Sequence, residues 1–333
     1  MAEREGAIAA FLAASGWGEA ERVALAGDAS FRRYSRLTRK GTSALLMDAP
    51  PPHEDVRPYL AVDRILRELG FSAPAILAGD EAAGLLLIED FGDDTYARLL
   101  GRGEDEAALY ALAVDVLIAL HRRCKSDAAT LPPYDDARLL NEAALLVDWY
   151  LPAVTGAPTS PALRESYLEL WRGLLPLARA VPECLVLRDY HVDNLMRIPG
   201  REGIAACGLL DFQDAVTGPI TYDLVSLLED SRRDIALELA ASMRARYLAA
   251  FPGLDREAFA ASFAVLGAQR HCKVVGIFTR LDRRDHKPRY LGHIPRLWRL
   301  IDQDCQEPAL APVKAWLDRH IPHALRVTPK VAS

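Results

Sequence analysis

Two stretches of this sequence decide its fold: Leu185-Val186-Leu187-Arg188-Asp189-Tyr190-His191-Val192-Asp193-Asn194-Leu195-Met196, and then Gly208-Leu209-Leu210-Asp211-Phe212-Gln213-Asp214-Ala215. Residues 195–210 have the pattern of a β-hairpin, with two short apolar runs separated by turn-forming residues. A hairpin brings its second end back to where its first end began. We therefore expect Asp211 to lie beside Asn194.

The residue types in these stretches indicate phosphoryl transfer. The reaction needs a carboxylate beside the attacking hydroxyl and oxygen ligands for the magnesium ions that bridge the ATP phosphates. Asp189 is followed five residues later by Asn194, which is the spacing of a kinase catalytic loop. Asp211 adds a second carboxylate of the kind that a hard cation prefers. Loop Asp and Asn residues often only form turns, but the whole combination favours a phosphotransferase site.

Bulk composition is that of an ordinary globular protein. The chain has 333 residues, of which 50% are hydrophobic and 26% charged, and its formal net charge is −6. The net charge gives no overall attraction to nucleic acid. No apolar run approaches the ~20 residues that span a bilayer, and the acidic start does not resemble a signal peptide. We expect a cytoplasmic protein that acts on a small molecule, as a monomer or, alternatively, a homodimer.

Strand and helix patterns divide the chain at about residue 92. Residues 1–92 predict a β-rich lobe with one helix inside the strand series, and residues 93–333 predict a larger helical lobe around the hairpin. The fold class is α+β. Strands are expected at 22–26, 31–37, 43–49, 75–78 and 85–89, and helices at 56–69, 95–100, 104–123, 138–150, 161–180, 222–251, 256–278 and from 294 onward.

This arrangement resembles the aminoglycoside phosphotransferase and choline kinase branch of the protein-kinase-like fold, over nearly the whole chain. The resemblance implies a small N-terminal lobe with a five-stranded antiparallel sheet, with ATP and Mg²⁺ as cofactors. It implies that Asp189 is the catalytic carboxylate and that Asn194 and Asp211 bind the metal. The nucleotide-binding positions that it implies are Gly27, Asp28, Ala29 and Ser30 in a loop, Met47 on the third strand, and Glu89, Asp90 and Phe91 in the hinge.

Departures from the protein-kinase pattern favour a small-molecule kinase. Leu187 and Gln213 stand where protein kinases have the His of their catalytic loop and the Gly after their metal-binding Asp. The third strand also lacks the usual phosphate-contacting lysine, and Met47 stands near its place. Arg32 or Arg33 could supply the missing positive charge. A nucleotide-binding pseudokinase is the alternative that this gap leaves open.

A narrower resemblance extends over residues 211–224, 47–52, 269–271, 276–278 and 293–297. These segments are similar to bacterial anomeric kinases for N-acetylmuramate and N-acetylglucosamine. The resemblance implies transfer of the ATP γ-phosphate to the C1 hydroxyl of an amino sugar, within the recycling of peptidoglycan sugars. A kinase for aminoglycosides or other small alcohols remains the alternative.

Two residues are assigned to support of the catalytic loop. Asp223 stands near the start of a predicted helix, where a carboxylate suits the helix dipole, and the resemblance implies that it braces the loop. Arg188 is given the same supporting role.

Substrate-binding residues are predicted less specifically. His191 could orient its neighbours or contact the substrate, and Asp214 could touch the substrate or the metal, or bond only to local backbone. Arg270 and His271 begin a basic region. Such a run is often a solvated face, but an arginine fork suits the lactyl carboxylate of N-acetylmuramate.

Overall fold

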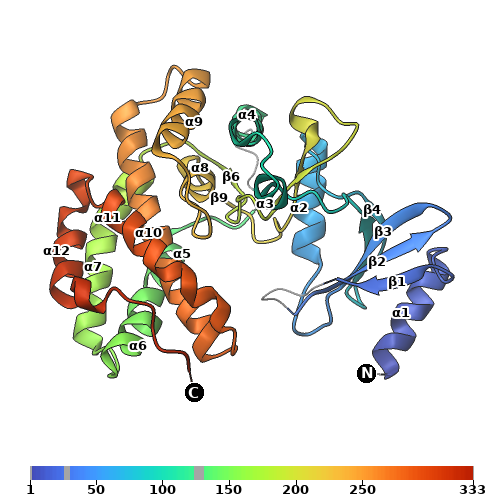
Figure 1. The fold of residues 1–333 in the computed structure, drawn as a ribbon, viewed down its shortest axis with the longest axis horizontal. Helices are drawn as coiled ribbons and strands as arrows, with labels where there is room; N and C mark the ends of the chain where they lie inside the picture. The colour runs from blue at the N-terminus through green and yellow to red at the C-terminus, as the bar shows by residue number, and fades with distance from the viewer. Residues whose placement is uncertain (1, 26–30, 124–130, 333) are drawn as a thin grey trace. The chain divides into compact units, whose positions relative to one another are not determined.

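The computed structural model describes residues 2–25, 31–123 and 131–332. The chain forms two compact units, each of which combines segments that are far apart in sequence. The first unit contains Met1–Val116 and Val192–Asp214, and the second contains Leu117–His191 and Ala215–Ser333. In Figure 1 the first unit includes the blue strands and the second includes the orange and red helices.

The first unit is built on a five-stranded antiparallel sheet with the strand order β1-β2-β3-β5-β4. This confirms the predicted sheet and the predicted order of three strands, one helix and two strands. The strands are β1 (Glu21–Ala24), β2 (Arg33–Arg39), β3 (Thr42–Asp48), β4 (Ile76–Asp80) and β5 (Leu85–Glu89).

Alternation along the central strands gives this sheet two apolar faces. Leu46 and Leu87 pack with Ile8 and Leu12 of helix α1 (Ala2–Ala14), which lies beside the sheet in Figure 1. Met47 is the next residue along β3, so it faces the opposite side of the sheet. Helix α2 (Arg57–Glu68) has a strongly amphipathic sequence and buries its own apolar face.

The predicted hairpin also belongs to the first unit. Strands β7 (Leu195–Arg197) and β8 (Cys207–Leu209) pair antiparallel, and a short 3₁₀ turn, η2 (Gly203–Ala206), leads into the second of them. Helix α3 (Tyr96–Gly101) is joined to the start of the hairpin by a hydrogen bond from Ala97 N to Val192 O of 3.0 Å. Helix α4 (Glu106–Arg123) runs from the first unit into the second.

The second unit is mainly helical, with one small antiparallel pair of strands, β6 (Glu183–Val186) and β9 (Val216–Pro219). Its longest helix, α10 (Arg256–Arg283), contacts most of the others. The remaining elements are α5 (Asp136–Ala143), the π-helical η1 (Leu146–Tyr150), α6 (Leu151–Thr155), α7 (Pro161–Ala178), α8 (Thr221–Leu228), α9 (Leu237–Ala250), η3 (Pro288–His293), α11 (Ile294–Asp304), η4 (Pro308–Leu310), α12 (Ala311–His320) and η5 (His323–Leu325).

Two helix predictions are wrong in detail. The single helix expected at 222–251 is divided into α8 and α9, because residues 229–236 leave the helical conformation after Glu229. The helix expected at 138–150 ends as α5, and its last turn widens into the π-helical η1. In the described part of the chain, no helix is both long and apolar enough to cross a bilayer.

Gly276 lets α10 approach the segment before η1. A Cβ atom built on Gly276 would lie 2.3 Å from the carbonyl carbon and oxygen of Leu145. Only a residue without a side chain fits against a neighbouring backbone at this distance. Gly276 of the Gly276-Ile277-Phe278 motif is therefore required for close packing within the helical unit.

We expect Gly276→Ala to destabilise the protein by about 1–3 kcal/mol, because the added methyl group must displace backbone. Gly173 is the matched control, since it lies in the exposed middle of α7 with no atom within 4 Å of its built Cβ. Gly173→Ala should be neutral or stabilising, by up to about 1 kcal/mol, because alanine favours the helix. Urea unfolding followed by circular dichroism measures both, and equal stability of the two variants would contradict the packing argument.

Candidate active site

One carboxylate holds the first two residues of the predicted catalytic loop. Asp223 accepts hydrogen bonds from the backbone amides of Leu187, at 2.6 Å, and Arg188, at 2.9 Å. Asp223 lies in the first turn of α8, which follows β9, and β9 pairs with the strand that leads into the loop. Burial raises the pKa of Asp223 to about 7, although the two amides and Arg270 act to lower it. This is the contact that a bracing role requires.

A set of buried charges holds the unusual backbone at Arg188. This residue has a φ of +71°, a region that residues with a side chain rarely adopt. Its guanidinium pairs with Glu142 of α5, which also accepts a hydrogen bond from the Tyr134 hydroxyl and lies 3.1 Å from Lys273 Nζ. Burial acts against the charge on Arg188, but Glu142, Tyr134, Tyr222 and Asp189 together outweigh burial and raise the pKa of Arg188. The loop conformation is therefore fixed by long-range ion pairs.

Asp189, the predicted catalytic carboxylate, is kept ionised by the cations of α10. Burial acts to raise its pKa, but Arg270 and Lys273, followed by His191 and Arg188, outweigh burial and hold the pKa below its ordinary value. A carboxylate in this state can accept a hydrogen bond from a substrate hydroxyl at neutral pH.

The hairpin brings Asn194 and Asp211 together, as the sequence predicts. Leu210 N donates a hydrogen bond of 3.0 Å to Asn194 O, which places Asp211 next to Asn194 along the ladder. Asp211 has a φ of +58°. Its Oδ1 accepts hydrogen bonds from Gln213 Nε2, at 3.0 Å, and from Arg32 Nη2, at 3.2 Å. The carboxylate is thus oriented by two side chains while it stays 43% exposed.

This pair of side chains fits a magnesium ion. Mg²⁺ prefers oxygen ligands, and it is commonly bound by one or two protein side chains together with substrate phosphates. Asn194 offers an amide oxygen and Asp211 a partly exposed carboxylate, at adjacent ends of one hairpin. Phe212 anchors the second end, because its ring stacks on Tyr59 of α2 with centroids 4.8 Å apart.

The predicted hinge residues use their side chains to hold the protein together. Glu89 Oε2 accepts a hydrogen bond of 3.2 Å from Ala75 N, and Asp90 Oδ2 lies 2.8 Å from Arg36 Nε. Phe91 is buried in a small apolar cluster with side chains of the hairpin. If this segment binds a nucleotide, its backbone groups would therefore make the contacts.

Of the other predicted nucleotide-binding positions, the structure describes Met47 alone. Met47 is 1% exposed and pairs with Tyr34 on β2 and with Leu86 on β5. Gly27, Asp28, Ala29 and Ser30, the predicted loop over the phosphates, lie outside the described residues.

Two of the predicted substrate-binding residues are close in sequence to other predicted site residues: His191 follows Asp189 by two residues, and Asp214 follows Asp211 by three. His191 is buried, with Nε2 3.3 Å from Arg232 Nη1 in the segment between α8 and α9. Asp214 is exposed and accepts a hydrogen bond of 3.3 Å from Gln213 Nε2. The sequence had given no indication of the contact between Arg232 and His191. Contact of His191 and Asp214 with a substrate stays a prediction.

Arg270, by contrast, is buried among protein groups. It is 5% exposed, and its Nη2 donates a hydrogen bond of 2.6 Å to Ser226 Oγ. Its charge acts on Asp189. This placement favours an effect on the substrate through Asp189 over direct binding of a sugar carboxylate, which stays an untested prediction.

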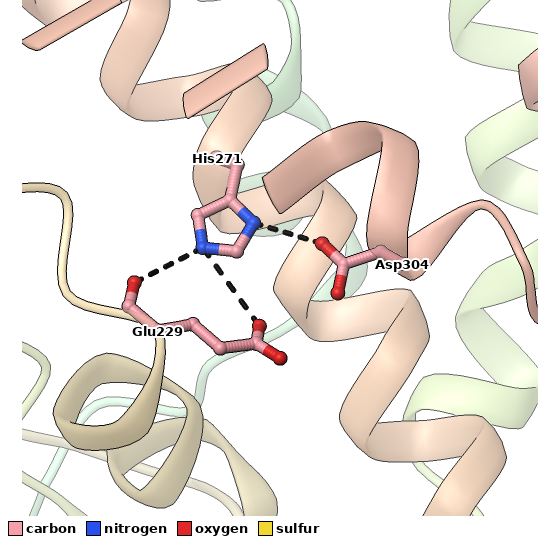
Figure 2. A group of neighbouring side chains, drawn as sticks. All are labelled: Glu229, His271 and Asp304. Carbon is pink, nitrogen blue, oxygen red and sulfur yellow. Dashed lines mark hydrogen bonds and ion pairs between the residues drawn. The ribbon is translucent and has the colours of Figure 1, made fainter. Parts of the chain in front are cut away.

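His271 lies in a buried cluster with Glu229 and Asp304, at the meeting of α8, α10 and α11 (Figure 2). Its Nδ1 is 2.8 Å from Asp304 Oδ2, and its Nε2 is 3.2 Å from Glu229 O and 3.8 Å from Glu229 Oε2. Burial lowers the pKa of His271 to about 4 and raises the pKa of both carboxyls. Gly267 makes room, because a Cβ there would lie 2.8 Å from Asp304 Oδ1.

The hydrogen-bond directions in this cluster follow from its neutral state. A neutral imidazole has one N–H, and the carbonyl of Glu229 can only accept, so Nε2 is the donor and Nδ1 accepts a hydrogen bond from the carboxyl group of Asp304. The three side chains lie close enough to hold a metal ion. Both ring nitrogens of His271 already have protein partners, however, and we assign the cluster a role in joining three helices.

Comparison with known proteins places the chain. Residues 21–261 match the sequence pattern of the phosphotransferase enzyme family. The chain belongs to this family. The predicted resemblance and the predicted phosphotransferase activity are thereby confirmed.

Relatives with similar sequences include two bacterial enzymes named N-acetylmuramate/N-acetylglucosamine kinase. The protein from Caulobacter vibrioides is 42% identical, with 96% of this chain and 97% of its own length covered. The protein from Pseudomonas aeruginosa is 39% identical, with 87% of this chain and 86% of its own length covered.

Solved structures share the fold of this phosphotransferase. Choline kinase LicA from Streptococcus pneumoniae has a TM-score of 0.60 at 11% identity, with 96% of this chain and 100% of that chain covered. The ADP-bound aminoglycoside phosphotransferase APH(2'')-Ib has a TM-score of 0.56 at 15% identity, with coverages of 84% and 92%. The predicted α+β fold class is confirmed.

We expect Asp223→Ala to lower kcat by about 10-fold or more, because two amides of the catalytic loop lose their acceptor. Asp255→Ala is the matched control: Asp255 also accepts from two backbone amides, those of Glu257 and Ala258, but at the start of α10. It should cost about 1 kcal/mol of stability and leave kcat unchanged. Steady-state kinetics of both variants at matched folded fraction make the comparison, and equal kcat values would remove the bracing role.

Proposed function

We propose that this phosphotransferase uses ATP to phosphorylate the anomeric C1 hydroxyl of N-acetylmuramate and N-acetylglucosamine in the cytoplasm, for the reuse of peptidoglycan sugars. The observation that carries the proposal is the ionised Asp189 on a braced loop, in a chain that matches kinases of these sugars over nearly its whole length. The products would be sugar 1-phosphates.

Each group of site residues has a proposed task. Asp189 orients the sugar hydroxyl, and Asn194 and Asp211 would hold Mg²⁺, which supplies charge compensation to the phosphate oxygens when it is bound. Residues 1–92 form the proposed nucleotide-binding lobe, with the hinge at Glu89 to Phe91 beside the adenine. Residues 93–333 provide the sugar site.

The proposed reaction is a direct in-line transfer. The C1 oxygen forms a bond to the γ-phosphorus while the bond from this phosphorus to the β,γ-bridging oxygen breaks, and ADP leaves with that oxygen. The hydroxyl proton passes to the Asp189 carboxylate late in the step, because a loose transition state asks little of a base. Most of the rate acceleration then comes from positioning and from charge compensation.

The lowered pKa of Asp189 suits an anomeric acceptor. A carboxylate whose pKa is held below its ordinary value is a weak base, and it is best matched to an acidic hydroxyl. The hemiacetal hydroxyl at C1 is more acidic than the primary and secondary alcohols of the same sugar. This difference supports transfer to C1 rather than to C6.

We expect the protein, incubated with ATP, Mg²⁺ and each sugar, to give a product whose phosphorus signal couples to the anomeric proton in ³¹P NMR. A 6-phosphate would refute the anomeric assignment. Product from an aminoglycoside panel but from neither amino sugar would establish the alternative acceptor class. ATP binding without any product would establish a pseudokinase.

Asp189→Asn should lower kcat by about 10²-fold or more, because the asparagine cannot take the hydroxyl proton. Affinity for the nucleotide should stay within about twofold of wild type, since Asp189 is proposed to contact the sugar hydroxyl and not the nucleotide. Asp193→Asn is the control in the same loop, because Asp193 is exposed. Turnover and nucleotide titration are measured for both variants, and near-normal turnover of Asp189→Asn would refute its assignment.

A further inference from the structure

The proposed reaction needs a positively charged side chain that contacts the phosphates of ATP. Phosphoryl transfer spreads negative charge over the transferred group, and kinases place a lysine of the third strand on the phosphates. Strand β3 of this protein contains no lysine, and the side chain of Met47 is buried in the sheet. Another cation must meet the phosphates if the chain is to transfer them efficiently.

Arg32 lies next to the position where that lysine would stand. Tyr34 pairs with Met47 across β2 and β3, so the two side chains share one face of the sheet. Arg32 lies directly before β2 and two residues before Tyr34, so a continuation of the strand alternation would set it toward the same face. Burial raises the pKa of Tyr34 to about 12, while the charge of Arg32 acts to lower it, which shows that the two groups are close.

The contacts of Arg32 direct its charge toward the proposed metal site. Arg32 Nη2 lies 3.2 Å from Asp211 Oδ1, and Arg32 Nε lies 3.7 Å from Glu54 Oε2. Glu54 is itself positioned, because its Oε1 accepts a hydrogen bond of 3.1 Å from Phe31 N. The arginine side chain is 12% exposed. It therefore stands in a fixed position beside a carboxylate that is open to a ligand.

The two arginines of β2 nearest to Arg32, Arg33 and Arg36, do not contact Asp211 in the described structure. Arg33 is exposed and, by strand alternation, faces the α1 side of the sheet, where it lines a hollow with Ile8 and Asp48. The Arg36 guanidinium is bound by Asp90 and Asp93. Arg33 is therefore on the other face of the sheet from Tyr34, and the charge of Arg36 is already paired with two carboxylates.

We propose that Arg32, positioned by Glu54, takes the part of the phosphate-binding lysine and contacts the β- and γ-phosphates of ATP beside Asp211. The inference rests on the proposed use of ATP and on the proposed metal-binding role of Asp211. It adds a catalytic residue, Arg32, and a positioning residue, Glu54, to the proposed site.

Electrostatics explain how Arg32 can serve both Asp211 and the nucleotide. Without a nucleotide, the arginine neutralises Asp211 and keeps its carboxylate oriented. When the phosphates and a cation arrive, Asp211 gains a stronger partner and the phosphates bring new negative oxygens. The guanidinium has five N–H donors, so it can turn part of its fork to the phosphates while it keeps its ion pair with Glu54.

The test separates contact with the phosphates from contact with the rest of the nucleotide. ATP, ADP and adenosine are titrated against wild type, Arg32→Ala, Arg32→Lys, Glu54→Gln and the control Arg33→Ala, and kcat is measured with N-acetylglucosamine. Arg32→Ala should lose about 10²-fold in kcat/KM for ATP and bind ATP more weakly. It should bind adenosine as wild type does.

Arg32→Lys should recover part of the loss, since it keeps the charge without the fork. Glu54→Gln should raise the KM for ATP more than it lowers kcat, and Arg33→Ala should match wild type. If Arg32→Ala unfolds, Arg32→Gln replaces it as the neutral variant. Unchanged ATP affinity and turnover in the neutral variant, or an equal loss of adenosine and ATP affinity, would overturn the inference. Wild type that binds ATP but phosphorylates no sugar would instead refute the proposed function, and the binding series would still decide the role of Arg32.

Discussion

A carboxylate that must stay charged in a largely buried place is the constraint on which the helical unit depends. The pKa of Asp189 is held below its ordinary value because Arg270 and Lys273, one turn apart on α10, together with His191 and Arg188, outweigh the effect of burial. Buried cations need partners of their own, and these are Glu142 for Lys273 and Ser226 for Arg270. The charge on Asp189, the proposed catalytic carboxylate, is thus compensated by buried groups on several helices, and α10 is placed by electrostatics as well as by apolar packing.

The features that the sequence predicts correctly are those with local causes. The hairpin at 195–210 follows from two apolar runs and a turn, and its pairing alone places Asp211 beside Asn194. The five strands are predicted by alternation, and the order of strands and helix along the chain then indicates the fold. These elements are specified by residues close to one another in sequence, so a single sequence suffices to find them.

The features that the sequence does not show depend on contacts between distant residues. Arg188 and Glu142 are 46 residues apart, and Arg32 and Asp211 are 179 apart, so no local pattern pairs them. The division of the helix expected at 222–251 has a similar origin. The backbone carbonyl of Glu229, where α8 ends, is hydrogen-bonded by His271 from another helix. The spacing of apolar residues along a helix does not indicate such a partner.

The first compact unit is discontinuous in sequence, and this has a consequence for how the protein can be divided. Its hairpin, Val192–Asp214, is inserted between two segments of the second unit. A fragment that ends near residue 92 would keep the sheet but lack both proposed metal ligands. A fragment that begins there would contain the hairpin without its contacts to Phe91 and Tyr59. The two units therefore cannot be exchanged between related proteins by a single crossover, and recombination that keeps both intact must join the chain at three places.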